Sequence, residues 1–124
     1  KMKRIIMDLD DTISTTKNGN YTASIPDQKI IEKMRAYKKL GFDIVISSSR
    51  NMRTYDGNVG LINANTLPII INWLIKHDVP YDEIYVGKPW CGFEGFYVDD
   101  KAIRPDEFKD LDYNQIKDLL GIGK

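Results

Sequence analysis

Short apolar runs that alternate with helical segments constrain the fold of this chain more than any other feature. Lys3–Leu9 and Phe42–Ser47 are rich in β-branched residues and show no apolar-polar alternation. Such runs are typical of parallel strands buried on both faces. Glu83–Gly87 and Gly95–Val98 predict a third and a fourth strand.

Segments with helical spacing separate these strands. Asp27 is a candidate N-cap, apolar residues then recur at helical spacing to Leu40, and Gly41 stands where a terminating glycine belongs. Further helices are predicted from about Thr66 to His77 and from Asp112 to Leu120. The alternation predicts an α/β fold with a three-layer, Rossmann-like, mostly parallel sheet.

The remaining segments are polar, and the chain is short. Asp10–Pro26 is a polar stretch with a turn signal at Asn18-Gly19, and residues 51–65 predict a loop. A length of 124 residues fits one domain. We assign it to 2–124, because Met2 is the expected native start after Lys1.

Charge and cysteine content narrow the class of protein. Lys plus Arg equals Asp plus Glu at 18 each, which argues against a nucleic acid or a membrane surface as the main partner. We find neither a run long enough to span a bilayer nor the apolar segment of a signal peptide. The single cysteine, Cys91, excludes an internal disulfide. These features predict a cytoplasmic protein.

Polar clusters follow each predicted strand at its carboxyl end. In parallel α/β sheets these ends meet at one edge, where ligands bind. We therefore expect the clusters to converge on one site. The residues are Asp8, Asp10, Ser48, Lys88, Asp99 and Asp100.

Such a cluster has a limited set of chemical uses. Several carboxylates cannot all stay ionised in one cleft without a cation. Oxygen ligands favour Mg²⁺, which usually binds a few carboxylates, waters and a phosphate oxygen. The lysine and the serine hydroxyl predict a phosphate beside that ion. A carboxylate could then attack phosphorus and form an aspartyl-phosphate.

The motifs "DLDDT", "ISSSR", "VGKP" and "YVDD" resemble those of the haloacid dehalogenase superfamily of phosphatases. The resemblance covers Lys3 to about Phe108. It implies a fold of that type and a Mg²⁺-dependent phosphatase. The second aspartate of "DLDDT" favours phosphate ester hydrolysis over dehalogenation, which needs no acid/base group there.

The resemblance also implies roles for individual residues. Asp8 matches the nucleophile and Asp10 the general acid/base, with the Asp10 carbonyl joining the Asp8 side chain on the metal. Ser48, with Ser49 beside it, and Lys88 match the phosphate-binding groups.

The remaining carboxylates are assigned by the same resemblance. Asp100 is the expected direct metal ligand. Asp99 either orients Lys88 or is the alternative ligand. Asp11 stands where relatives often carry glycine, so we expect it to be exposed and without a catalytic role.

The loops "SSSRNMRTYDGNVGLIN", "EIYVGKPWCG" and "VDDKAIRP" are similar to those of small phosphatases encoded among bacterial capsule-biosynthesis genes. The segments between the motifs are too short for a cap domain, which implies an open site or one covered by another subunit in a homo-oligomer. The implied substrate is a phosphorylated sugar or a phosphorylated group on a nucleotide-linked sugar.

Four residues near the motifs are weaker candidates for substrate binding. Arg50, Asn51 and Arg53 follow the predicted phosphate-binding serine, although ordinary loop polarity explains them about equally well. Trp90 could stack on a sugar or a base, or pack over its own loop.

Three other functions remain open at this point. A phospho-acceptor receiver domain also unites acidic residues, a hydroxyl and a lysine on a parallel sheet. Its middle strand should end in an aspartate, whereas Phe42–Ser47 ends in serines. A phosphotransferase or mutase shares the first half-reaction. A non-catalytic binding subunit could retain the fold.

Overall fold

The computed structural model describes residues 2–16 and 20–123. The chain divides into two compact units, Lys1–Trp90 and Cys91–Lys124, where the sequence predicted one domain over 2–124. The turn predicted at Asn18-Gly19 lies outside the described residues.

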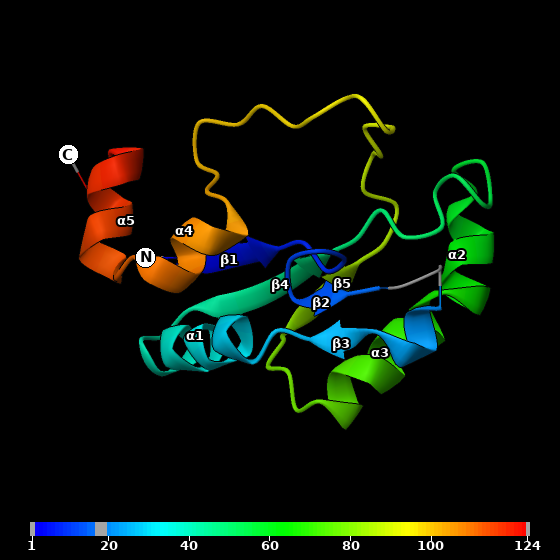
Figure 1. Cartoon of the computed structure of the whole chain (residues 1–124), viewed down its shortest axis with the longest axis horizontal. Helices are drawn as coiled ribbons and strands as arrows, with labels where there is room; N and C mark the ends of the chain where they lie inside the picture. The colour runs from blue at the N-terminus through cyan, green and yellow to red at the C-terminus, as the bar shows by residue number, and fades with distance from the viewer. Residues whose placement is uncertain (1, 17–19, 124) are drawn as a thin grey trace. The chain divides into compact units, whose positions relative to one another are not determined.

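The first unit is built on a parallel sheet, as predicted, and this sheet has three strands. Its strands β1 (Arg4–Met7), β4 (Asp43–Ser47) and β5 (Glu83–Tyr85) lie in the order β1-β4-β5 (Figure 1). The central strand is covered on both faces, because its Ile44, Val45 and Ile46 side chains are at most 1% exposed. Because the three strands are parallel, their carboxyl ends point to one edge of the sheet.

Helix α1 (Gln28–Lys39) confirms the predicted first helix and lies against β4. The Asp27 side chain accepts hydrogen bonds from the backbone N–H groups of Lys29 and Ile30, which is the action of an N-cap. Gly41, with φ of +92°, follows the helix end in the left-handed conformation that glycine adopts freely. The buried face of the helix comprises Ile30, Ile31, Met34 and Tyr37.

Helix α3 (Leu67–Lys76) confirms the second predicted helix and buries Ile70, Trp73 and Leu74. The Trp73 indole N–H donates to the backbone carbonyl of Ser24 at 2.9 Å, so α3 also holds the polar segment that follows β1. That segment contains the antiparallel pair β2 (Ser14–Thr15) and β3 (Ile25–Pro26), and a 3-10 turn, η1 (Tyr21–Ala23).

The predicted loop over residues 51–65 is wrong in its second half. Residues Val59–Asn65 form helix α2, which Asn58 caps by accepting from the Leu61 N–H. Ile62 is the buried residue of this helix. A two-turn helix with one buried apolar position gives no periodic signal in the sequence.

The predicted fourth strand is also wrong. Gly95–Val98 lies in neither a helix nor a strand. β1 is consequently at the edge of the sheet, and its Ile6 side chain is 57% exposed although the sequence predicted a strand buried on both faces.

The second unit holds helices α4 (Pro105–Asp110) and α5 (Tyr113–Leu120). The latter confirms the helix predicted from Asp112. Asp112 and Gln115 form a reciprocal capping box, in which each side chain accepts the other's backbone N–H. Gly121, with φ of +68°, follows the end of α5.

None of the described helices is long and apolar enough by itself to cross a membrane. Helices α2 and α3 meet the length and composition criterion only when taken together, across a bend of 42°.

Candidate active site

The segment that follows β1 positions two carboxylates by alternation. Met7 and Leu9 are buried, whereas the intervening Asp8 and the following Asp10 are only partly covered. The Leu9 carbonyl accepts the N–H groups of Thr12, Ile13 and Ser14 at 2.9–3.3 Å. This turn therefore holds Asp8 and Asp10 on the side away from the core.

Asp8 contacts a hydroxyl and an ammonium group. The Thr12 hydroxyl donates to Asp8 Oδ2 at 3.1 Å, and Lys88 Nζ lies 3.6 Å from Asp8 Oδ1. Gly87 precedes the lysine with φ of +81°, and a Cβ atom there would lie 3.0 Å from the Val59 side chain. Only glycine fits this turn without strain. The turn directs the chain so that Lys88 reaches Asp8.

Burial dominates the ionisation of Asp8. Desolvation raises the pKa of the Asp8 carboxyl above its ordinary value, because the charged form loses water. The Lys88 ammonium, the Thr12 hydroxyl and the Leu9 backbone partly offset this rise, and the neighbouring Asp10 carboxylate adds to it. Asp8 is thus a carboxylate that would gain from a nearby cation.

The raised pKa predicts a pH dependence of stability in the absence of divalent cations. Above the ordinary pKa of 3.8, folded Asp8 holds its proton more strongly than the unfolded chain does. The free energy of unfolding should therefore fall as the pH rises from 3.8 through the raised pKa. Denaturant unfolding in EDTA at several pH values would measure it. The difference between wild type and Asp8→Asn should grow in favour of the variant over this interval, and a difference that does not change with pH would contradict the assignment.

Asp10 forms a bidentate ion pair with Arg50. Arg50 Nη2 donates to Asp10 Oδ1 at 2.7 Å and Arg50 Nε donates to Asp10 Oδ2 at 3.0 Å. The arginine side chain is 1% exposed and its guanidinium stacks 4.1 Å from the centre of the Tyr21 ring. Arg50 Nη1 is buried with no hydrogen-bond partner in the described part of the chain. Because both Asp10 oxygens are engaged, this carboxylate is held in one orientation.

Two hydroxyl groups and a tyrosine complete the surroundings of Asp10. The Thr16 hydroxyl donates to Asp10 Oδ1 at 3.3 Å and shares a 2.7 Å hydrogen bond with the Ser24 hydroxyl. Burial, followed by the nearby Asp10 carboxylate, raises the pKa of Tyr21. The Tyr21 phenol therefore stays neutral beside the ion pair.

Ser48 links the two acidic positions. Its buried hydroxyl oxygen accepts the Arg50 backbone N–H at 3.1 Å, and its carbonyl accepts the Lys88 backbone N–H at 3.1 Å. Asp8, Lys88, Ser48, Arg50 and Asp10 are thus joined in one continuous series of contacts. These residues come from the ends of the three strands, so the predicted convergence is observed for the part of the set that lies in the first unit.

The other predicted substrate residues have different surroundings. Asn51, with φ of +63°, donates to the Thr54 hydroxyl and accepts from the Thr66 hydroxyl at 2.7 Å, so it ties the loop after β4 to the start of α3. Arg53 is exposed and Trp90 is 39% exposed. The Ser49 carbonyl accepts the Met52 N–H in the turn after β4.

The predicted acidic pair of the fourth strand lies in the second unit. Asp99 and Asp100 are exposed, and Asp99 Oδ1 accepts the Lys101 backbone N–H at 2.8 Å. Asp11 is exposed, as predicted, and its φ of +60° is one that glycine adopts more easily. The latter agrees with the resemblance, in which relatives often carry glycine at this position.

The first unit fits a magnesium ion only in part. Asp8 offers a carboxylate, but the oxygens of Asp10 are engaged by Arg50. Among the described residues, no three His, Cys, Asp or Glu side chains are grouped closely enough to hold a metal ion. Mg²⁺ accepts one or two carboxylates when waters and a substrate phosphate complete its shell. Asp8 is therefore a sufficient starting ligand, and a further carboxylate would strengthen the site.

Sequence reasoning missed the groups that orient the two aspartates. Thr12 is the last residue of the motif "DLDDT", four residues after Asp8, so the motif could have indicated its contact with Asp8. Thr16, Tyr21 and Ser24 lie in a polar stretch without periodicity. No local pattern indicates that these three side chains gather around the Asp10–Arg50 pair.

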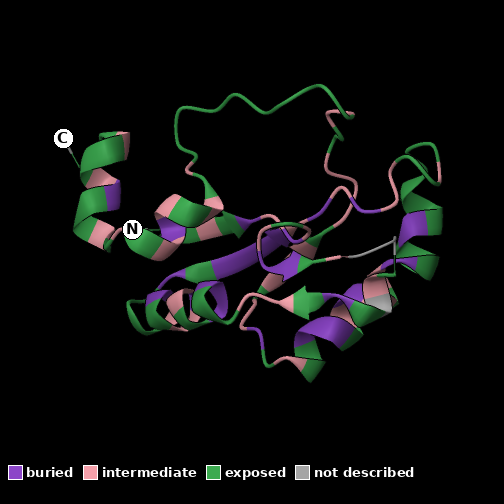
Figure 2. Cartoon of the chain, in the orientation of Figure 1, coloured by how far each residue is buried: buried purple, intermediate pink, exposed green. Residues whose placement is uncertain are grey.

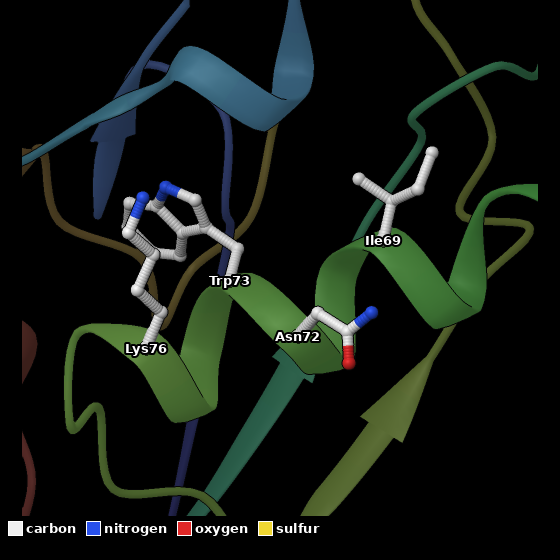
Figure 3. Close-up of a pocket in the computed structure, with 4 residues that line it drawn as sticks. All are labelled: Ile69, Asn72, Trp73 and Lys76. Atoms are coloured by element: carbon white, nitrogen blue, oxygen red, sulfur yellow. The ribbon is translucent and has the colours of Figure 1, made fainter.

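A pocket on α3 is not lined by these carboxylates. It has a volume of about 230 Å³ and is lined by Ile69, Asn72, Trp73 and Lys76 (Figure 3). Its lining contains no carboxylate and no residue of the acidic site, so it offers no support for catalysis there.

Comparison with known proteins gives one informative result. A crystal structure of a target protein from Vibrio cholerae shares 54% sequence identity with this chain and superposes with a TM-score of 0.95. The match covers 99% of this chain and 100% of that chain. No protein-family model matches the sequence, and neither does any curated protein.

Proposed function

We propose that this chain, which belongs to the same family as the Vibrio cholerae protein, is a magnesium-dependent phosphomonoester hydrolase of the haloacid dehalogenase superfamily type. The observation that carries the proposal is the continuous series of contacts from Asp8 through Lys88, Ser48 and Arg50 to Asp10 at the carboxyl edge of the sheet. It combines a nucleophile, cationic groups and a second carboxylate.

The proposed reaction has two half-reactions. An Asp8 oxygen attacks phosphorus, the bond from phosphorus to the alcohol oxygen breaks, and Asp10 gives a proton to that oxygen. Asp10 then takes a proton from a water molecule whose oxygen attacks phosphorus. The bond from phosphorus to the Asp8 oxygen breaks, inorganic phosphate leaves, and the Asp8 carboxylate and the protonated Asp10 are restored. Both Asp10 oxygens accept from Arg50 in the described conformation. One of these bonds must open before Asp10 can transfer a proton.

The surrounding residues stabilise the charge that develops during transfer. The Lys88 ammonium is within 3.6 Å of the nucleophile, so it can also contact an oxygen of the bound phosphoryl group. The Ser48 hydroxyl accepts from Arg50 and keeps its own hydrogen for a phosphate oxygen. A magnesium ion held by Asp8 and the Asp10 carbonyl would neutralise phosphoryl charge as the substrate binds.

The substrate class is proposed from the loops. Their resemblance to those of capsule-biosynthesis phosphatases suggests a phosphorylated sugar or a phosphorylated group on a nucleotide-linked sugar. The first unit has no inserted cap between Arg50 and Lys88, where α2 and α3 occupy the chain. A bulky substrate is compatible with such a site.

Removal of the metal gives the direct test. We expect phosphate release from a panel of sugar phosphates and phosphorylated nucleotide sugars in Mg²⁺, a fall to background in EDTA, and recovery when Mg²⁺ is restored. Inorganic phosphate is the measured product. Equal rates in Mg²⁺ and EDTA would contradict the metal requirement. Absence of turnover across the panel, together with no aspartyl-phosphate trapped by rapid quenching, would contradict the phosphatase.

A further inference from the structure

β1 is one of the two edge strands of the parallel sheet, with β5 at the opposite edge. β1 pairs with β4 on one side, and no strand pairs with its other side in the described part of the chain. Ile6 in this strand is 57% exposed. Parallel sheets are normally covered, and an exposed apolar edge strand is a template for pairing with another chain.

A segment with the composition of a strand is also exposed. Phe96 and Val98 are 80% and 87% exposed, in a stretch from Cys91 to Arg104 that contains neither helix nor strand. Figure 2 shows most of this stretch in green, the colour of exposed residues. Aromatic and β-branched residues favour a pleated, half-buried surface, and the sequence alone predicted a strand here.

The second unit is too short to stabilise this exposed segment by itself. Units shorter than about 40 residues rarely fold without a disulfide, a metal or a partner. Cys91–Lys124 is that short, and Cys91 is a free thiol. The match to the Vibrio cholerae crystal structure covers 99% of this chain and therefore includes the segment. The residues of the segment therefore have counterparts in that protein.

We propose that two copies of this chain exchange these segments, so that Gly95–Asp100 of each copy pairs with the open edge of β1 in the other. In the described part of each copy, β1 has an unpaired side and one strand-like segment lies outside the sheet. Exchange about a two-fold axis pairs the edge of β1 and the strand-like segment in each of the two copies. Ile6, Phe96 and Val98 would then be covered.

Parallel pairing would also complete the site. With Val98 beside Met7, the last residue of β1, Asp99 and Asp100 of one copy follow beside Asp8 of the other. A second carboxylate thereby reaches a site that offers Asp8 for a cation and holds Asp10 on Arg50. The inference that the exchange supplies a metal ligand rests on the proposed function. The inference that the strands are exchanged does not.

Complementation between two inactive variants tests the exchange through activity. Asp8→Asn and the double variant Asp99→Asn/Asp100→Asn are co-expressed with different affinity tags, and the mixed species is purified. In a mixed dimer one site combines the Asp8→Asn substitution with the substituted segment, while the other has Asp8 and an intact segment. We expect each variant alone to be inactive and the mixed dimer to regain about half the wild-type activity. An inactive mixed dimer would overturn the exchange if wild type is active.

Cross-linking tests the exchange without activity. In a Cys91→Ser background, Ile6→Cys in one copy and Tyr97→Cys in the other should give a disulfide-linked dimer upon mild oxidation of the co-expressed pair. Placing both substitutions in one chain should give linked dimers and not internally linked monomers. Light scattering should report a dimer for wild type. A monomeric wild type, or a link formed only within one chain, would overturn the exchange.

Failure of the proposed strand exchange can be distinguished from failure of the proposed phosphatase activity. Cross-linked dimers without turnover in wild type would support the exchange and contradict the phosphatase. Turnover in wild type without intermolecular links or complementation would support the phosphatase and contradict the exchange.

Discussion

Replacement of Asp8 by asparagine is expected to lower the rate of phosphate release by at least about 1,000-fold. An amide is a poor nucleophile towards phosphorus, and the aspartyl-phosphate could not form. The carboxamide has nearly the same size as the carboxylate, so the contact with the Thr12 hydroxyl at Oδ2 can be kept. Steady-state phosphate release and trapping of the phosphoenzyme measure the two parts of this prediction.

The stability of the Asp8→Asn variant separates chemistry from folding. Burial raises the pKa of Asp8, which means that its charge is unfavourable in the folded state without a cation. The variant should therefore unfold in EDTA at a temperature equal to or above that of wild type at neutral pH.

Asp11→Asn is the matched control. It makes the same aspartate-to-asparagine change three residues after Asp8. Asp11 is exposed and has a φ of +60°, which asparagine tolerates. It should leave the rate within about two-fold of wild type, since surface substitutions away from the reacting groups have small effects. Comparable losses of phosphate-release rate in both variants would contradict the assignment of Asp8 as the nucleophile.

Replacement of Arg50 by methionine is expected to lower the free energy of unfolding by about 3 kcal/mol. Breaking a buried ion pair from one side leaves the other charge uncompensated, which costs about 3–5 kcal/mol. The Asp10 side chain is 26% exposed and keeps some water, so the lower end of that range applies. The stacking on Tyr21 is lost as well. Such a loss is a large fraction of the stability of a small protein. Urea unfolding measures it.

Two further variants identify the cause of that loss. Arg35→Met removes a guanidinium whose partner, Asp78, has a side chain 96% exposed, and should cost below about 1 kcal/mol. Asp10→Asn added to Arg50→Met should recover part of the stability, because it removes the charge that was left without a partner. A double variant less stable than Arg50→Met would show that the loss comes from packing and not from charge.

Elements with strong periodicity were predictable from the sequence. α1 has an N-cap at Asp27 and apolar residues at helical spacing, and β4 has an unbroken β-branched run. In these cases local propensity and burial favour the same structure. The positions of Asp8, Ser48 and Lys88 followed, because the carboxyl ends of parallel strands share one edge.

Short elements without periodicity were not predictable. Helix α2 buries Ile62 alone, and the pair β2 and β3 has two residues in each strand. Their backbone hydrogen bonds are stabilised by contacts with distant parts of the first unit, such as the Trp73 indole on the Ser24 carbonyl. A local sequence window does not contain such a partner.

The sequence by itself determined the strand-helix alternation and the residue types at each strand end, since both depend on spacing along the chain. The tertiary structure alone decided that Arg50 holds Asp10 over the Tyr21 ring. It also decided that Gly95–Val98, a strand by composition, forms no strand in the described part of the chain, where β1 is an edge strand. Composition shows that a segment can form a strand. Whether it does depends on an edge to pair with, and that edge can belong to another copy of the chain.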